Sequence, residues 1–264
     1  MNNPIKAFKS RLGMYSKDYQ KLVLMTYLRA PEIILRRLKS NLIKGIYYKA
    51  RGKQQESIRI FLEGSATWGD FVQEMTATKI VKIGNFSEVP ESGHIVCINH
   101  VNELDFPFDC MIVNKPYLAN QVIKNTLFAY WWMKAMGSQV FDYSQSRTIP
   151  ESVKNLIEGL KNNSYIVYPE GQNTYSEEIK PLKKGMIKIA HEKNIPIALV
   201  IKSGIAKFQE KVKGNAIGYK YYGTIQPSKF SKWENLRDEL HEIMVQEKNI
   251  LDEEVRKEEG KKNA

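Results

Sequence analysis

The strongest constraint on the fold is an alternation of short apolar segments and helical segments that begins near residue 79. Strands are expected, in chain order, at 79–86, 94–99, 117–123, 138–143, 165–171, 195–203 and 216–225. Helices are expected between them at 105–113, 126–136, from Thr148 onward, and at 185–194. Alternating strands and helices are typical of parallel strands joined by helical crossovers. The sequence therefore predicts an α/β fold: a largely parallel mixed sheet flanked by helices.

Two helix starts carry recognisable capping signals. Thr148 is followed by Pro150 and Glu151, which is the capping-box pattern with proline in the first turn. Ser231, with Glu234 three residues later, predicts the start of a last helix.

The net charge of +11 is concentrated at one end of the chain. Residues 1–53 contain 13 Lys or Arg and two acids, and the remainder is neutral. Apolar residues between these cations favour a basic amphipathic helical segment that lies on a membrane surface. A solvated helical arm and a nucleic-acid-binding tail are the alternatives. We expect three parts: a membrane-docking segment at 1–78, an α/β domain at 79–247 and a charged flexible tail at 248–264.

Targeting and metal-binding signals are weak. The opening residues lack an apolar stretch, and the apolar run 22–28 is far shorter than the ~20 residues that span a bilayer. The two cysteines, Cys97 and Cys110, cannot form a disulfide framework, which favours a reducing cytosolic setting. His94 and His100 flank one predicted strand and lack further ligands, so we expect no metal.

His100 is the most informative of the four histidines. It follows the predicted strand 94–99 directly, where ligands bind in open α/β sheets, and Asp105 begins the next helix. An aspartate within reach can fix the imidazole tautomer and stabilise the imidazolium. No Gly-x-Ser-x-Gly nucleophile elbow is present, so a nucleophilic hydroxyl has to come from a substrate. A structural histidine at a strand end is the alternative.

Four segments in order carry a family resemblance: "NHVNELD" (99–105), "GSQVFDYSQSR" (137–147), "VYPEGQNTYS" (167–176) and "IPIALV" (195–200). Together they resemble the sequence blocks of the lysophospholipid and glycerolipid acyltransferase family, typified by 1-acylglycerol-3-phosphate acyltransferases. The resemblance extends over about residues 80–225. The spacing of His100 and Asp105 and the Pro-Glu-Gly at 169–171 are its most specific elements.

The resemblance implies acyl transfer from an acyl thioester, carried by CoA or acyl carrier protein, to a hydroxyl of a lipid acceptor. His100 would be the general base, and Asp105 would orient it. Backbone amides of the loop after His100, or a nearby cation, would stabilise the oxyanion. The substrate-binding residues that the resemblance suggests are Asn99, Lys124, Arg147, Glu170, Gly171, Lys183 and Lys184. No cofactor is implied beyond the thioester co-substrate.

Two arginines of the family pattern are absent. Tyr143 follows Asp142 where the second block usually has arginine, and Asn173 stands in the arginine's place in the third. These arginines are associated with the acceptor's phosphate, whose charge asparagine cannot match. Either the neighbouring cations compensate, with Arg147, Lys124, Lys180, Lys183 and Lys184 as candidates, or the acceptor is not a simple phosphomonoester.

We therefore expect a peripheral enzyme of phospholipid biosynthesis at the cytoplasmic face of a membrane, with 1-acylglycerol-3-phosphate as the default acceptor and no nucleic-acid partner. One alternative keeps the chemistry and changes the acceptor to a head-group-bearing lysolipid, an amino-acid lipid or a glycolipid. The other is a non-catalytic membrane-binding member of the fold.

Overall fold

The computed structural model describes residues 15–120, 127–141 and 149–261. Its helices are α2 (Lys17–Leu28), α3 (Ala30–Arg36), α4 (Lys39–Ala50), α5 (Gln54–Thr76), α6 (Asp105–Ile112), α7 (Leu127–Ala135), α8 (Ile149–Leu160), α9 (Lys184–Glu192) and α10 (Trp233–Gly260). Its strands are β1 (Lys79–Ile83), β2 (Ile95–Ile98), β3 (Leu118–Asn120), β4 (Gln139–Phe141), β5 (Tyr165–Val167), β6 (Ile197–Ser203) and β7 (Ala216–Ile225). Short 3-10 turns lie at Phe86–Glu88, Ala206–Gln209 and Pro227–Lys229.

The main sheet has the order β1-β7-β6-β2-β5. Strand β2 runs parallel to both of its neighbours, β5 and β6, and β1 runs parallel to β7, whereas β6 and β7 are antiparallel. A second, parallel pair of β3 and β4 adjoins this sheet through a bridge between Tyr117 and Ile166. The predicted largely parallel mixed sheet is thus confirmed, and β1 forms an edge.

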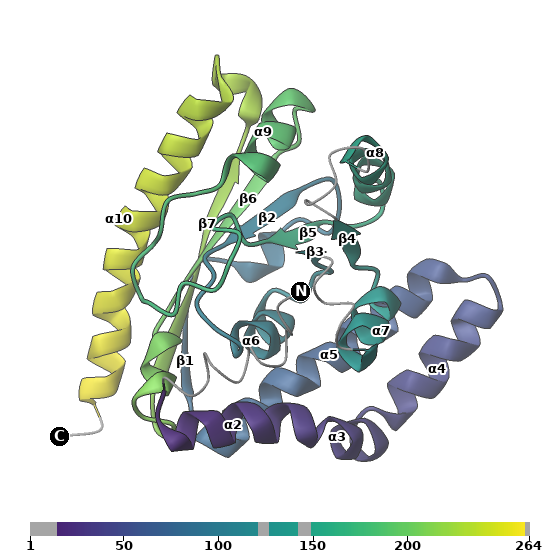
Figure 1. Cartoon of the computed structure of the whole chain (residues 1–264), viewed down its shortest axis with the longest axis vertical. Coiled ribbons are helices and arrows are strands. Elements are labelled where there is room, and N and C mark those ends of the chain that lie inside the picture. Colours follow the sequence, from purple (N-terminus) through teal and green to yellow (C-terminus); the bar gives the residue numbers. More distant parts are fainter. Residues whose placement is uncertain (1–14, 121–126, 142–148, 262–264) are drawn as a thin grey trace, which may run out of the picture.

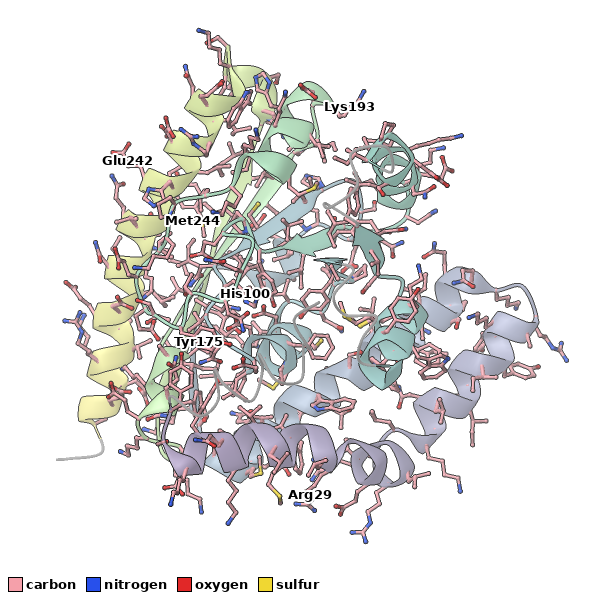
Figure 2. The ribbon with its side chains drawn as sticks, in the orientation of Figure 1. Arg29, His100, Tyr175, Lys193, Glu242 and Met244 are labelled. Atoms are coloured by element: carbon pink, nitrogen blue, oxygen red, sulfur yellow. The ribbon has the colours of Figure 1, made fainter. Side chains whose placement is uncertain are left out.

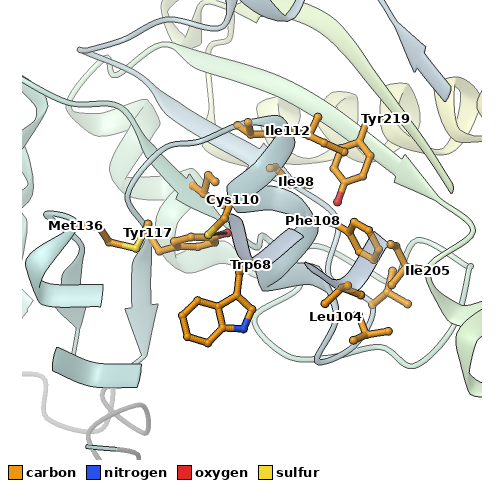
Figure 3. Close-up of a cluster of buried hydrophobic side chains, with 14 of the residues drawn as sticks. Trp68, Ile98, Leu104, Phe108, Cys110, Ile112, Tyr117, Met136, Ile205 and Tyr219 are labelled. Atoms are coloured by element: carbon orange, nitrogen blue, oxygen red, sulfur yellow. Dashed lines mark hydrogen bonds between the residues drawn. The ribbon is translucent and has the colours of Figure 1, made fainter. Parts of the chain in front are cut away.

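Helices cover both faces of the sheet, as Figure 1 shows, with α10 along one side and α5, α6 and α7 on the other. Because side chains alternate along a strand, each central strand contributes to two cores. In β6, Leu199 and Ile201 join the core beneath α9 and α10, whereas Ala198 and Val200 join the core beneath α6. Figure 3 shows part of the α6 core, in which Phe108, Tyr117 and Trp68 are packed.

The N-terminal helices share the α6 core with the sheet. Tyr19, Leu22 and Ile33 of α2 and α3 are buried in the same cluster as β2 and α6. Helix α5 packs closely on α6 at Gly69, where an added Cβ would lie 2.5 Å from the carbonyl oxygen of Pro107. These helices are therefore integral to the folded body. None of the described helices is both long enough and apolar enough to cross a membrane.

The prediction of a flexible tail from residue 248 is wrong. Helix α10 continues to Gly260, and Leu251 and Val255 are fully buried. They extend the apolar stripe that begins at Leu236, and both meet β7 at Gly218, which has no side chain.

The predicted helix starts have different outcomes. The N-cap residue of α10 is Lys232 with extended backbone and no side-chain hydrogen bond, so Ser231 is not the cap. The Thr148 cap lies outside the described residues, although α8 begins directly after it at Ile149.

Candidate active site

Three adjacent parallel strands end at the candidate site. Strand β2 leads into Asn99 and His100, β5 leads into Tyr168, Pro169 and Glu170, and β6 ends with Lys202 and Ser203. Since carboxyl ends of parallel strands meet at one edge of a sheet, the topology brings these residues together. Figure 2 shows His100 in the middle of the molecule, near α6.

His100 and Asp105 form the pair that the sequence predicts. The ring Nδ1 of His100 lies 2.6 Å from Oδ2 of Asp105. The same oxygen accepts hydrogen bonds from the backbone amides of Val101 at 2.6 Å and Asn102 at 3.2 Å. These bonds fold the loop around the carboxylate at the first residue of α6. The His100 side chain remains 18% exposed, whereas that of Asp105 is 1% exposed.

A buried lysine, which the sequence analysis missed, completes this arrangement. The Nζ of Lys202 lies 3.0 Å from Oδ1 of Asp105 and 2.9 Å from Oδ2 of Asp109. Burial opposes ionisation of Asp105, but the Lys202 ammonium and the hydrogen bond from His100 outweigh burial and lower the pKa of the carboxyl. Asp105 is therefore held in its ionised form.

Two simple signals point to this lysine and its second partner. Asp109 lies four residues after Asp105 on the same face of α6. Lys202 falls on the same face of β6 as Ala198 and Val200, so strand alternation directs it towards α6.

Tyr168 is a further residue that the sequence analysis missed. Its ring stacks on the imidazole of His100, with centroids 3.9 Å apart and planes 9° from parallel. Its hydroxyl donates to Asp109 at 2.7 Å, and Lys202 Nζ lies 4.9 Å from the ring centre. Tyr168 thus restricts the imidazole on one side and is itself held at its far end by Asp109.

Glu170 anchors two backbone segments at the site. Its Oε2 accepts from the His100 amide and its Oε1 from the Lys180 amide, at 3.2 Å for the latter. Burial raises the pKa of Glu170 to about 7, against the opposing effect of these two backbone hydrogen bonds. Gly171, at φ +72°, turns the chain in the left-handed region. Glu170 therefore holds the loop that carries His100, and Gly171 allows the turn beside it.

Two sequence-based expectations are corrected. The side chain of Asn99 is buried, and it bonds the backbone of Lys202 at both the carbonyl oxygen (3.0 Å) and the amide (2.8 Å). Asn99 therefore fastens β2 to β6 and does not present its amide to a substrate. The loop amides nearest the imidazole, among those that were expected to bind an oxyanion, are engaged, because those of Val101 and Asn102 donate to Asp105 and that of His100 donates to Glu170.

The predicted basic residues are only partly placed. Lys183 and Lys184 are exposed at the start of α9, and the Lys183 amide donates to the carbonyl of Pro169 at 2.8 Å. This bond ties the start of α9 to the Pro-Glu-Gly turn. Lys124, Arg147, Asp142 and Tyr143 lie outside the described residues.

Asn173 faces an acidic residue. Its amide nitrogen lies 3.4 Å from Oε1 of Glu103 and 3.1 Å from the hydroxyl of Tyr175. Tyr175 also donates to Glu103, and Tyr19 of α2 donates to the other carboxylate oxygen at 2.8 Å. A Glu103 hub, made of these four residues, therefore lies where the family pattern has an arginine.

The segment of the Glu103 hub is paired with the His100 loop. The hydroxyl and amide of Thr174 donate to the His100 carbonyl at 2.7 and 3.1 Å, and the amide of Tyr175 donates to the Val101 carbonyl at 2.8 Å. In the part of the chain that the structure describes, no group of three His, Cys, Asp or Glu side chains could hold a metal ion.

Comparisons with known proteins agree with this geometry. A family model described as "Acyltransferase" matches residues 80–201. A 1-acyl-sn-glycerol-3-phosphate acyltransferase from Cocos nucifera is 27% identical over 157 residues, which cover 56% of this chain and 50% of that protein. The chain thus matches about half the length of this relative.

The crystal structure of the 1-acyl-sn-glycerophosphate (LPA) acyltransferase PlsC from Thermotoga maritima has the same fold. It aligns with a TM-score of 0.71 and 20% identity over 87% of this chain and 94% of that chain. The segment matched by the family model contains His100, Asp105 and Glu170 and ends one residue before Lys202. Residues 80–201 of the chain thus match the acyltransferase family, and this segment contains the His100–Asp105 pair.

Proposed function

We propose that the protein transfers an acyl group from an acyl thioester to a hydroxyl of a lysophospholipid, with 1-acylglycerol-3-phosphate as the default acceptor, in phospholipid biosynthesis. The observation that carries this proposal is the 2.6 Å contact between His100 Nδ1 and Asp105 Oδ2 in a family match that contains both residues. The donor is acyl-CoA or acyl-ACP, and no other cofactor is required.

The geometry supports direct attack by the acceptor. Because Nδ1 donates to Asp105, Nε2 on the other edge of the ring is the nitrogen that takes the acceptor's hydroxyl proton. The alkoxide oxygen bonds to the thioester carbon, the carbon–sulfur bond then breaks, and the departing thiolate takes the proton back from the imidazolium. Asp105 stabilises the imidazolium between these two steps. A nearby cation is the favoured proposal for the oxyanion, since the amides of His100, Val101 and Asn102 are engaged.

The Glu103 hub favours a second candidate acceptor. A carboxylate repels a phosphate dianion, and Asn173 supplies no charge to offset it. A lysolipid whose phosphate carries a head group, an amino-acid lipid or a glycolipid would avoid this repulsion, and the chemistry at His100 would be unchanged.

The assay that tests the function uses purified protein, radiolabelled acyl-CoA or acyl-ACP, and a panel of lysolipids. We expect release of free thiol together with a labelled diacyl product for at least one acceptor. Preference for 1-acylglycerol-3-phosphate would support the default, and preference for a head-group-bearing lysolipid would support the second candidate. Absence of turnover with every acceptor and both donors would contradict acyl transfer.

We also propose that the enzyme docks on the cytoplasmic face of a membrane through α2, α3 and α4. Large apolar side chains on these helices are exposed, among them Leu28 (65%) and Leu35 (67%). Others are Leu24, Ile43, Ile46 and Tyr47. The same segment carries exposed basic side chains, namely Lys17, Lys21, Arg36, Arg37, Lys39, Lys44 and Lys49. A segment with exposed apolar side chains and cations fits an anionic lipid surface.

Binding to lipid vesicles tests this docking surface. Point variants are preferable to a deletion of residues 1–53, because the deletion would remove buried core residues such as Tyr19 and Leu22. We expect Leu28→Ser combined with Leu35→Ser to weaken sedimentation with anionic vesicles by roughly thirtyfold or more, because each change loses roughly 1–2 kcal/mol of apolar transfer and about 1.4 kcal/mol is a factor of ten. Raised salt should weaken the binding of the unaltered protein.

Ile250→Ser is the matched control, because Ile250 is 48% exposed on α10, away from the docking surface. Equal loss of binding in this control, or duplex DNA binding without vesicle affinity, would contradict the docking proposal.

A further inference from the structure

The charges beneath His100 form a buried chain in which Lys202 is the central link. One Nζ atom touches carboxylates of both Asp105 and Asp109, at 3.0 and 2.9 Å, and all three side chains are at most 1% exposed. Asp109 has further donors, the hydroxyls of Tyr168 at 2.7 Å and Tyr219 at 2.6 Å. Nothing in the proposed reaction requires a second buried carboxylate or a buried lysine.

The two carboxylate oxygens of Asp105 have different partners. Oδ2 receives His100 Nδ1 and two loop amides, while Oδ1 faces Lys202. A lysine on its own at this place would neutralise Asp105 and weaken its attraction for an imidazolium. Burial raises the pKa of Asp109, while the Lys202 ammonium and the hydroxyl donors Tyr219 and Tyr168 act in the opposite direction. With Asp109 ionised, two carboxylates and one ammonium leave one net negative charge beside His100.

We propose that Lys202 and Asp109 form a charge-balanced buried pair that positions Asp105 and leaves its negative charge available to His100. Lys202 is then a positioning residue, which fixes Oδ1 so that Oδ2 points at the imidazole. Asp109 cancels the lysine's charge. This inference concerns the same site and rests on the proposed function for its consequences in catalysis, but the charge balance itself can be measured without substrate.

The titratable groups that are bonded to His100 or lie around its partners come from several elements. Asp105 and Asp109 belong to α6, Tyr168 and Glu170 follow β5, and Lys202 and Tyr219 belong to β6 and β7. Glu103 lies in the loop that follows His100. Lys202 and Asp109 are a directly bonded pair of opposite charges, and they can be removed separately or together.

The experiment is an NMR titration of the His100 imidazole in protein with labelled histidine, where four histidines give a resolvable set. Asp109→Asn removes the balancing charge and keeps the side-chain shape. We expect the midpoint of the imidazole titration to move to lower pH by about one unit, because the lysine then faces Asp105 alone. In the double variant with Lys202→Met, the midpoint should return to within a few tenths of a unit of its original value.

Of the three variants, Lys202→Met alone should have the lowest melting temperature, because it leaves two buried carboxylates without a cation. The double variant should melt at a higher temperature than Lys202→Met. If Asp109→Asn alone does not fold, the double variant is the test. It should melt at a higher temperature than Lys202→Met and keep the His100 titration midpoint of the unaltered protein. An unshifted titration in folded Asp109→Asn, or no rescue of Lys202→Met by the second substitution, would overturn the inference.

Lys248→Met is the matched control, because Lys248 is also buried and also touches two carboxylates, those of Glu177 and Asp252. It should lower the melting temperature without moving the His100 titration. In the acyl-transfer assay, the double variant should keep KM and lose several-fold in kcat, since Asp105 Oδ1 is no longer held.

The two proposals can fail independently. If the His100 titration shifts in Asp109→Asn but the protein transfers no acyl group, the proposed function is wrong and the charge balance is supported. If the protein transfers acyl groups but the titration does not shift, the charge balance is wrong and the proposed function is supported.

Discussion

Replacing His100 by alanine is expected to reduce kcat by about 10²–10⁴ with any accepted lipid, because the variant has no group to take the hydroxyl proton. The fold should survive, since the His100 side chain is partly exposed and its backbone bonds to Glu170 and Thr174 do not require the imidazole. KM for the donor should change little, because the proposed role is in the chemical step. The measurement is the rate of thiol release at saturating substrates, with circular dichroism to verify folding.

His94→Ala is the control for this variant. His94 lies at the other end of β2, with its ring nitrogen 2.8 Å from the Ser92 carbonyl, and it should leave kcat unaltered. Full activity in the His100 variant would eliminate general-base catalysis at this position. Loss of both activities would indicate damage to the fold instead.

Asp105→Asn is expected to cost about 10²–10⁴ in kcat, an effect of the size that follows when a triad aspartate loses its charge. Either orientation of the amide is unfavourable. With nitrogen at the Oδ2 position, it opposes the His100 ring and two loop amides, and with nitrogen at the Oδ1 position, it opposes the Lys202 ammonium. The imidazolium also loses its neighbouring negative charge, so the rate falls at every pH.

The same variant has a stability signature. The pKa of Asp105 is lowered in the folded protein, so its ionised form stabilises the fold above about pH 4, and this contribution is lost as pH falls through the lowered pKa. Asp105→Asn should therefore melt at a lower temperature at pH 7 and show a smaller further loss on acidification. Asp238→Asn on the exposed surface of α10 is the control. A variant that keeps both kcat and melting temperature would contradict the assigned role.

The sequence predicts the sheet well because strand periodicity and turn residues act locally. It also predicts that His100 and Asp105 meet, since His100 follows β2 and Asp105 begins α6, with one short loop between them. Lys202 escaped notice because lysine is ordinarily a surface residue, and only the pairing of β6 with β2 places it beneath α6. Its contact with Asp109 joins residues 93 positions apart, so strand alternation and helix spacing indicate the face of each residue but not their pairing.

The C-terminal error has a similar origin. The last residues are so highly charged that Leu251 and Val255, the apolar members that become fully buried, do not stand out. Burial of these two against Gly218 depends on a glycine in β7, more than thirty residues away. Asn99 was misassigned because the sequence shows its place beside His100 but not its bonds to the Lys202 backbone.

The Glu103 hub limits what a truncation of the protein can show. Tyr19 reaches from the first described helix to a carboxylate that sits three residues after the histidine. Shortening the chain past this tyrosine would take away one of the bonds that keep the histidine's own loop in shape. An inactive truncation would thus say little about the proposed docking surface, since the loss of Tyr19 also removes a bond to the loop that carries the histidine.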